Sequence, residues 1–255
     1  MLMILSPAKT FKIIKESSLE LSDDLIFKNK TKQLVEQLQS YSVTELANLM
    51  KMSEALAEVN QLRFSQFYEK TKQGMYAIHA FEGEAYKGLG SLSLTEQALK
   101  FSQESFRILS GLYGVLRPFD IMNPYRLEMG LSWSGEHGKD LYDYWKSDLT
   151  HYFLNELKET NGDQALINLA SKEYSKSLNL KEIEKNYPVI TIEFKEQKGE
   201  AFRVVGMYAK RARGQMARYI LNHQLHQVEK LKAFNEGGYT FNETLSTEKT
   251  WIFTR

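Results

Sequence analysis

The stretch Arg107–Gly130, RILSGLYGVLRPFDIMNPYRLEMG, carries the densest run of glycine, proline and arginine in the chain. Its apolar opening predicts a buried strand, and Gly111 and Gly114 indicate bends or close approaches of the backbone. Each proline disfavours the helical region for the residue before it, so the second half is expected to be a stiff, extended loop. Loops mounted on a buried strand often carry function.

The charges of this loop allow two interpretations. They either pair with one another as ion pairs or face a ligand, and the residues concerned are Arg117, Asp120, Arg126 and Glu128. The segment Gly111–Gly114 also resembles the turn of a helix-hairpin-helix, although it has one residue too many between its glycines. The strand interpretation competes directly with this weak match.

Composition narrows the class of protein. The 255 residues are 42% hydrophobic and 25% charged, with a net charge of +1, so polyanion binding would need a local basic patch. The absence of cysteine excludes disulfides, thiolate metal sites and a cysteine nucleophile. The apolar run Met1–Leu5 is too short for a signal peptide or a membrane span, so we expect a cytoplasmic protein without a membrane partner.

Two apolar runs end next to lysines. Leu2–Leu5 predicts a buried strand leading to Lys9, and Ala165–Ala170 predicts another leading to Ser171 and Lys172. Ser171 is a suitable N-cap, which places Lys172 at a helix start. Strand ends and helix N-termini favour anions, whereas the alternative is that both lysines are ordinary surface residues.

Helical periodicity is strongest in Asp140–Glu159, and Thr95–Arg107 also predicts a helix. The pair Val43–Met50 and Ser53–Tyr68 predicts a helical hairpin subregion, residues 43–68. Its turn lacks the glycine that would let backbone amides reach a phosphate, so we expect a packing role.

The remaining strands indicate the fold. Tyr76–Phe81 predicts a strand followed by a loop over residues 82–88, and alternation predicts a hairpin of Val189–Glu196 with Ala201–Tyr208. The remainder, which begins with Gly237-Gly238, predicts a closing hairpin with strands near Tyr239–Phe241 and Trp251–Phe253. Composition never shifts enough to mark a linker. We therefore predict an α+β fold: a single domain, residues 1–255, with a mixed β-sheet flanked by helices and a helical hairpin.

The segment Ala209–Asn222 predicts a helix with a basic arc formed by Lys210, Arg211, Arg213 and Arg218. Gly214 falls within that arc. Because glycine costs a helix roughly 1 kcal/mol, we interpret it as a place where the backbone approaches something bulky and negative. The alternative is a solvated basic face.

Several motifs together resemble the YaaA family of bacterial peroxide stress proteins, in the family's order and over nearly the whole chain: residues 6–10 (SPAKT), 80–89 (AFEGEAYKGL), 108–118 (ILSGLYGVLRP), 166–174 (LINLASKEY) and 208–214 (YAKRARG). The resemblance implies a cytosolic protein that limits oxidative damage during peroxide stress. It also implies an association with intracellular iron control, and DNA binding through a basic cleft and a helix-hairpin-helix element.

Nucleic-acid binding is the first functional hypothesis. Cations from strand ends, one loop and one helix face are expected to converge on a groove that contacts DNA phosphates: Lys9, Arg107, Arg117, Arg126, Lys172, Lys210, Arg211, Arg213 and Arg218.

An enzyme acting on a nucleotide or nucleic-acid substrate in the same cleft is the alternative. The candidate catalytic groups are Lys9, Asp120 and Glu128, with Lys172 and Glu173 nearby, but no recognised catalytic motif accompanies them. A pocket enclosing Lys9 beside buried carboxylates would favour this hypothesis.

Direct iron binding is the third functional hypothesis. His223 and His226 stand three apart without a carboxylate at matching spacing, so we predict no dedicated metal site and no cofactor, and expect any iron effect to be indirect.

Overall fold

The computed structural model describes residues 1–12, 23–69, 74–133 and 138–255, and the stretch Arg107–Gly130 opens in it as a β-hairpin. Strand β5 (Phe106–Ser110) pairs antiparallel with β6 (Gly114–Leu116). Gly114 has a φ of 70°, and a Cβ at Gly111 would lie 2.3 Å from the Leu127 carbonyl oxygen. The strand interpretation is therefore correct, and the helix-hairpin-helix match at these glycines is wrong.

The main sheet is mixed, as predicted, and runs in the order β11-β12-β9-β8-β1-β5-β6. Its parallel centre is β1 (Leu2–Leu5) between β5 and β8 (Leu166–Asn168). The sheet continues through β9 (Val189–Lys198) to β12 (Thr250–Thr254) and β11 (Thr240–Phe241), while β10 (Ala201–Arg203) forms a hairpin with β9. Two small ladders pair β2 (Thr10–Phe11) with β4 (Phe81–Glu82) and β3 (Met75–Tyr76) with β7 (Ile121–Met122).

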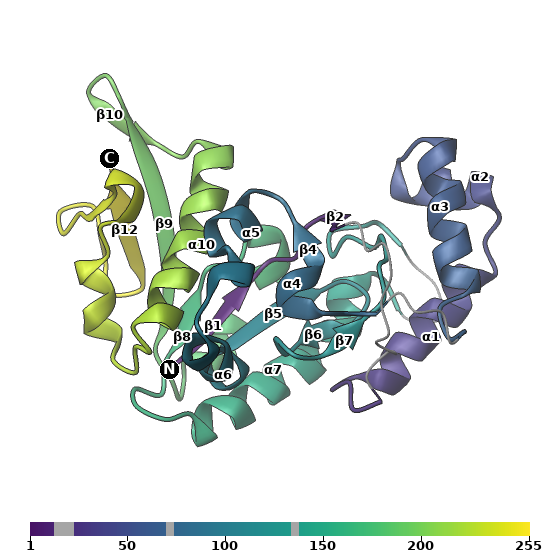
Figure 1. Ribbon diagram of the computed structural model, residues 1–255, viewed down its shortest axis with the longest axis horizontal. Coiled ribbons are helices and arrows are strands. Elements are labelled where there is room, and N and C mark those ends of the chain that lie inside the picture. The colour runs from purple at the N-terminus through teal and green to yellow at the C-terminus, as the bar shows by residue number, and fades with distance from the viewer. Residues whose placement is uncertain (13–22, 70–73, 134–137) are drawn as a thin grey trace.

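Helices cover both faces of this sheet (Figure 1). From β1 the chain crosses to β5 on one side in the sheet, and from β5 it crosses back past β1 to β8 on the other side. Because both connections are right-handed, the helices that they contain, α6 (Glu96–Ser105) and α7 (Leu141–Glu159), lie on opposite faces of the sheet. Helices α5 (Glu84–Leu89) and α10 (Gly206–Asn222) lie with α6, and α9 (Leu180–Ile183) lies with α7. Short elements complete the chain: α4 (Ala77–Ala80), α8 (Lys172–Ser175), and 3-10 turns at Ser91–Ser93, Val228–Ala233 and Glu236–Gly238.

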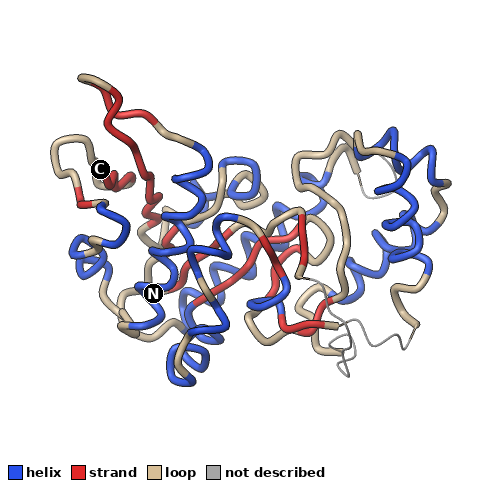
Figure 2. The backbone as a smooth tube through the Cα atoms, turned by 45° about the horizontal axis from the view of Figure 1, so that its top comes forward, coloured by secondary structure: helices blue, strands red, loops and turns tan. Residues whose placement is uncertain are grey.

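The predicted helical hairpin stands to one side of the sheet, together with the helix before it (Figures 1 and 2). It consists of α2 (Val43–Met50) and α3 (Glu54–Ser65), which follow α1 (Lys28–Gln39). Ser42 caps α2 in a reciprocal capping box with Glu45, and the Ser53 hydroxyl caps α3. Local sequence therefore fixes both helix starts, and the α+β fold class is confirmed.

Several predicted boundaries were wrong. Residues 76–81 form no continuous strand, because the Ala77 and Ile78 amides donate to the carbonyls of Asp120 and Pro118 and the chain turns into α4. Residues 82–88 are mostly helix α5 and not a loop. The second arm of the β9–β10 hairpin ends at Arg203, since α10 begins at Gly206. In the described part of the chain, no helix is both long and apolar enough to cross a membrane.

Candidate functional site: the strand-end pocket

A cavity of about 360 Å³ opens at the carboxyl ends of β1 and β8, and we call it the strand-end pocket. Ligands in α/β sheets favour this position, and the volume lies within the ~300–1,000 Å³ of small-molecule sites. Its walls come from the segment after β1 and from α5, α8 and α10, and its charged lining residues include Lys9, Glu84, Glu128, Glu173, Lys210 and Arg213.

Hydroxyl groups tie the two strand ends together at the floor. The Ser171 amide donates to the Ser6 hydroxyl (2.8 Å), and the two serine hydroxyls lie 3.2 Å apart. The Tyr86 hydroxyl donates to the Ser6 carbonyl at 3.0 Å. Tyr86 and Tyr174 are buried, and burial raises the pKa of each phenol well above its ordinary value. Both therefore remain neutral at physiological pH.

The central loop delivers a carboxylate to this pocket. Glu128 accepts from Arg126 at 2.8 Å, and its Oε1 lies 2.9 Å from Lys9 Nζ. Burial favours the protonated form of Glu128, but Lys9 and Arg126 outweigh it and lower the pKa of that carboxyl below its ordinary value. Glu128 is therefore an ionised acceptor or base, not a proton donor, at neutral pH.

Helix α10 presents its cations because it lies very close to α5. A Cβ at Gly214 would lie 1.7 Å from the Ala85 carbonyl oxygen, and a Cβ at Gly88 would lie 2.1 Å from the Arg211 carbonyl oxygen. The two glycines thus allow the helix backbones to touch. This corrects the interpretation of Gly214, which approaches a neighbouring helix and not an anionic ligand. The close crossing sets Lys210 and Arg213 into the pocket wall.

Arg213 is the least solvated cation of the wall. Its Nε is buried and, among the residues that the structure describes, has no hydrogen-bond partner. Burial lowers the pKa of Arg213 from its ordinary value, and the charge of Glu193 partly offsets this effect. An arginine remains protonated even so, and a buried donor without an acceptor is costly. The pocket wall therefore contains an arginine whose buried Nε has no acceptor among the described residues.

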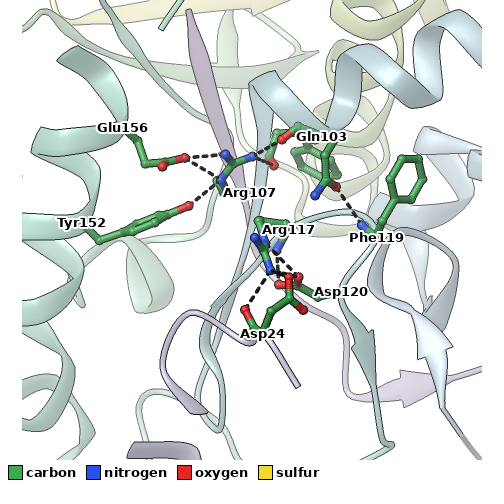
Figure 3. Close-up of polar contacts among 9 residues, drawn as sticks. Asp24, Gln103, Arg107, Arg117, Phe119, Asp120, Tyr152 and Glu156 are labelled. Atoms are coloured by element: carbon green, nitrogen blue, oxygen red, sulfur yellow. Dashed lines mark hydrogen bonds and ion pairs between the residues drawn. The ribbon is translucent and has the colours of Figure 1, made fainter. Parts of the chain in front are cut away.

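Two arginines of the predicted groove are engaged in structural contacts elsewhere (Figure 3). Arg107 is only 5% exposed, pairs with Glu156 and donates to the Tyr152 hydroxyl at 2.7 Å. Arg117 is held by Asp120 and by Asp24, each at 2.8 Å. Arg107 and Arg117 therefore form ion pairs within the protein and do not face a ligand in the strand-end pocket.

Arg218 is also held away from the pocket. Its Nη1 donates to the Leu89 and Gly90 carbonyl oxygens at 3.1 and 2.9 Å, which caps the C-terminus of α5. Lys172 begins α8 but does not line the pocket, whereas Arg211 lies near it, 4.0 Å from Glu84. The structure thus gathers Lys9, Arg126, Lys210, Arg211 and Arg213 around one site and leaves the other four predicted cations outside it.

Asp120 also lies outside the pocket. It is 3% exposed and accepts from the Arg117 amide at 2.8 Å, and burial is the main reason that its pKa is raised. Its contacts close the turn of residues 117–120, which is a structural role.

The sequence analysis did not predict that the Ser6 and Ser171 hydroxyls and Tyr86 would form the base of the pocket. The sequence does contain one indication of the two serines, because Ser6 and Ser171 each follow an apolar run that predicts a parallel strand. Among the described residues, no group of three histidines or carboxylates is placed to hold a metal ion.

Comparison with known proteins identifies similar sequences over the whole chain. A family model described as peroxide stress protein YaaA matches residues 1–245. A UPF0246 protein of Magnetococcus marinus is 46% identical over 100% of this chain and 99% of its own length. UPF0246 proteins of Caulobacter vibrioides and a Janthinobacterium species are each 41% identical over the whole chain and at least 98% of their own lengths.

Proposed function

Because the chain belongs to the YaaA family of peroxide stress proteins, we propose that it binds DNA non-specifically through the basic cleft around the strand-end pocket. Bound protein limits oxidative damage to the DNA in the cytoplasm, and its effect on intracellular iron is indirect.

The observation that carries this proposal is the set of cations at the pocket. Lys9, Lys210 and Arg213 come from two distant parts of the sequence and line one cavity. Glutamates line the same cavity. Glu84 pairs with Lys87, Glu128 pairs with Lys9 and Arg126, and Glu173 accepts from the Gly130 amide, while Glu82 also belongs to the lining. The net charge of +1 leaves little bulk attraction, so binding depends on these local contacts.

A salt titration tests DNA binding. Labelled duplex DNA is titrated with the protein across a series of potassium chloride concentrations. Replacing Lys9 and Lys210 by alanine is expected to weaken binding and to make the slope of log K against log salt shallower by about 1.8, at ~0.9 per lost phosphate contact. The matched control replaces Lys146 and Lys181, which are exposed on the helices of the opposite face. Equal slopes for the two double variants would end the proposal.

A nicking assay separates DNA protection from iron capture. Supercoiled plasmid is exposed to ferrous iron and hydrogen peroxide with wild-type protein or with the double variant Lys9→Ala/Lys210→Ala. Protection that disappears in this variant, while both proteins leave free ferrous iron unchanged, supports protection through DNA binding. Equal protection by both proteins together with a fall in free iron would show direct iron binding and refute the indirect role.

Catalysis is the second candidate function, and one observation favours it. Lys9 lies beside a pocket with the ionised, partly buried Glu128, as an enzyme acting on a nucleotide or nucleic-acid substrate would require. Mass spectrometry of oligonucleotides incubated with the protein would detect a product. Turnover by the wild type that is lost in Glu128→Gln while DNA affinity is retained supports catalysis, and an unchanged substrate argues for binding alone.

A further inference from the structure

Two exposed aliphatic side chains stand at the start of α10, Val204 just before it and Met207 in its first turn, whereas the exposed Tyr208 has the Arg255 guanidinium over its ring. Val204 is 54% exposed and Met207 is 58% exposed, although neighbouring residues of the helix such as Ala209 and Ala212 are buried. Large apolar side chains gain nothing from water, and a pair of them next to a charged site indicates a contact surface. Neither DNA phosphate binding nor the packing of α10 accounts for them.

Helical geometry places Met207 near Lys210, which lines the strand-end pocket. At ~100° per residue, Met207 shares a face of α10 with Lys210, Arg211 and Gly214. Gly214 lies against α5, and α5 and Lys210 both line the pocket. Met207 therefore lies about one turn before Lys210, on the side of the helix that carries this pocket cation.

The surroundings favour a nucleic acid over a membrane. Arg203, Lys210 and Arg211 flank the apolar pair, which gives it a cationic border suited to phosphates. Two side chains are too small an apolar face for stable membrane anchoring, which needs a long amphipathic helix or a second signal. Methionine is also one of the side chains that proteins insert between base steps.

We propose that Met207, supported by Val204, inserts into the base stack of bound DNA while one adjacent nucleotide enters the strand-end pocket. This inference rests on the proposed DNA binding and adds the ligand unit, a single unstacked nucleotide. The pocket suits it: Lys210 and Arg213 line it and supply positive charge for the phosphate, and the Glu128 carboxylate accepts from the N–H groups of a base. The methionine fills the gap that the nucleotide leaves.

Fluorescence of 2-aminopurine reports the unstacking. A duplex carries this base at a mismatch, where extrusion costs least. Wild-type protein is expected to raise the fluorescence severalfold. Met207→Ala is expected to lose most of that rise while keeping the salt slope of binding, and Met207→Leu is expected to keep it. Leu245→Ala, at an exposed apolar residue in the segment between β11 and β12, is the control and should behave as wild type.

The outcomes separate the two proposals. Salt-dependent binding without a fluorescence rise, or a rise that Met207→Ala retains, overturns the insertion and leaves DNA binding standing. Absence of any binding by the wild type overturns both. Vesicles containing anionic lipid form a further arm, and sedimentation with them that depends on Met207 would assign the apolar pair to a membrane surface and refute the insertion.

Discussion

Replacing Gly214 by alanine tests whether the touching backbones of α5 and α10 hold the site together. The new Cβ would lie 1.7 Å from the Ala85 carbonyl oxygen and 2.8 Å from the Leu89 amide nitrogen, so only movement of a whole helix relieves the overlap. Overpacking of this kind costs about 1–3 kcal/mol and sometimes more, whereas alanine returns about 1 kcal/mol of helix propensity. Because both obstacles are backbone atoms, we expect an overpacking cost of about 3–4 kcal/mol and a net loss of about 2–3 kcal/mol.

Urea denaturation followed by circular dichroism measures that loss, and a thermal scan should show a melting temperature lower by about 4–12 °C. Gly206→Ala is the matched control in the same helix, since no atom lies within 4 Å of its Cβ position. That variant should remain within about 0.5 kcal/mol of wild type. A Gly214→Ala protein as stable as wild type would refute the close crossing, and with it our account of how Lys210 and Arg213 are positioned.

Three further variants test the assigned roles. Arg107→Met should lower the free energy of unfolding by about 3 kcal/mol, because it strands Glu156, yet leave the DNA affinity of the folded protein unchanged. Tyr113→Phe should cost about 2–4 kcal/mol in the same assay, since the hydroxyl both donates to and accepts from the buried backbone of Asn123. Glu128→Gln removes a carboxylate whose folded pKa is lowered. Its stabilising contribution is therefore complete above the unfolded pKa of about 4.3 and disappears as pH falls through the folded value, so wild-type and variant stabilities should converge in acid. Urea titrations from neutral to acidic pH check this, and a gap that persists in acid would contradict it.

Local signals in the sequence predicted much of the fold. The strand of β1, the cap at Ser171 and the long helix α7 each depend on neighbouring residues, and each formed where expected. Residues 76–81 failed because their backbone bonds go to the central loop, some forty residues away in the sequence. Alternation within a short window contains no information about such a partner.

The site was predictable to the extent that strand ends define it. Lys9 and Ser171 reach the pocket because β1 and β8 are parallel neighbours. Gly214 was misread because a helical wheel shows only one helix, and the partner that needs its missing side chain is Gly88 with its flanking backbone. A glycine on a charged arc is ambiguous until the second helix is known.

The salt dependence of DNA binding counts the cations that take part, so it decides between the set of cations predicted from the sequence and the set that surrounds the pocket. Contacts by all nine predicted cations would give a slope near −8, at ~0.9 per phosphate. The five cations gathered around the pocket, Lys9, Arg126, Lys210, Arg211 and Arg213, would give a slope of about −4.5. A measured slope steeper than about −6 would require residues such as the buried Arg107 to leave its ion pair with the partly exposed Glu156, at a cost of about 3 kcal/mol. That cost exceeds what one phosphate contact returns, and we therefore expect the shallower slope.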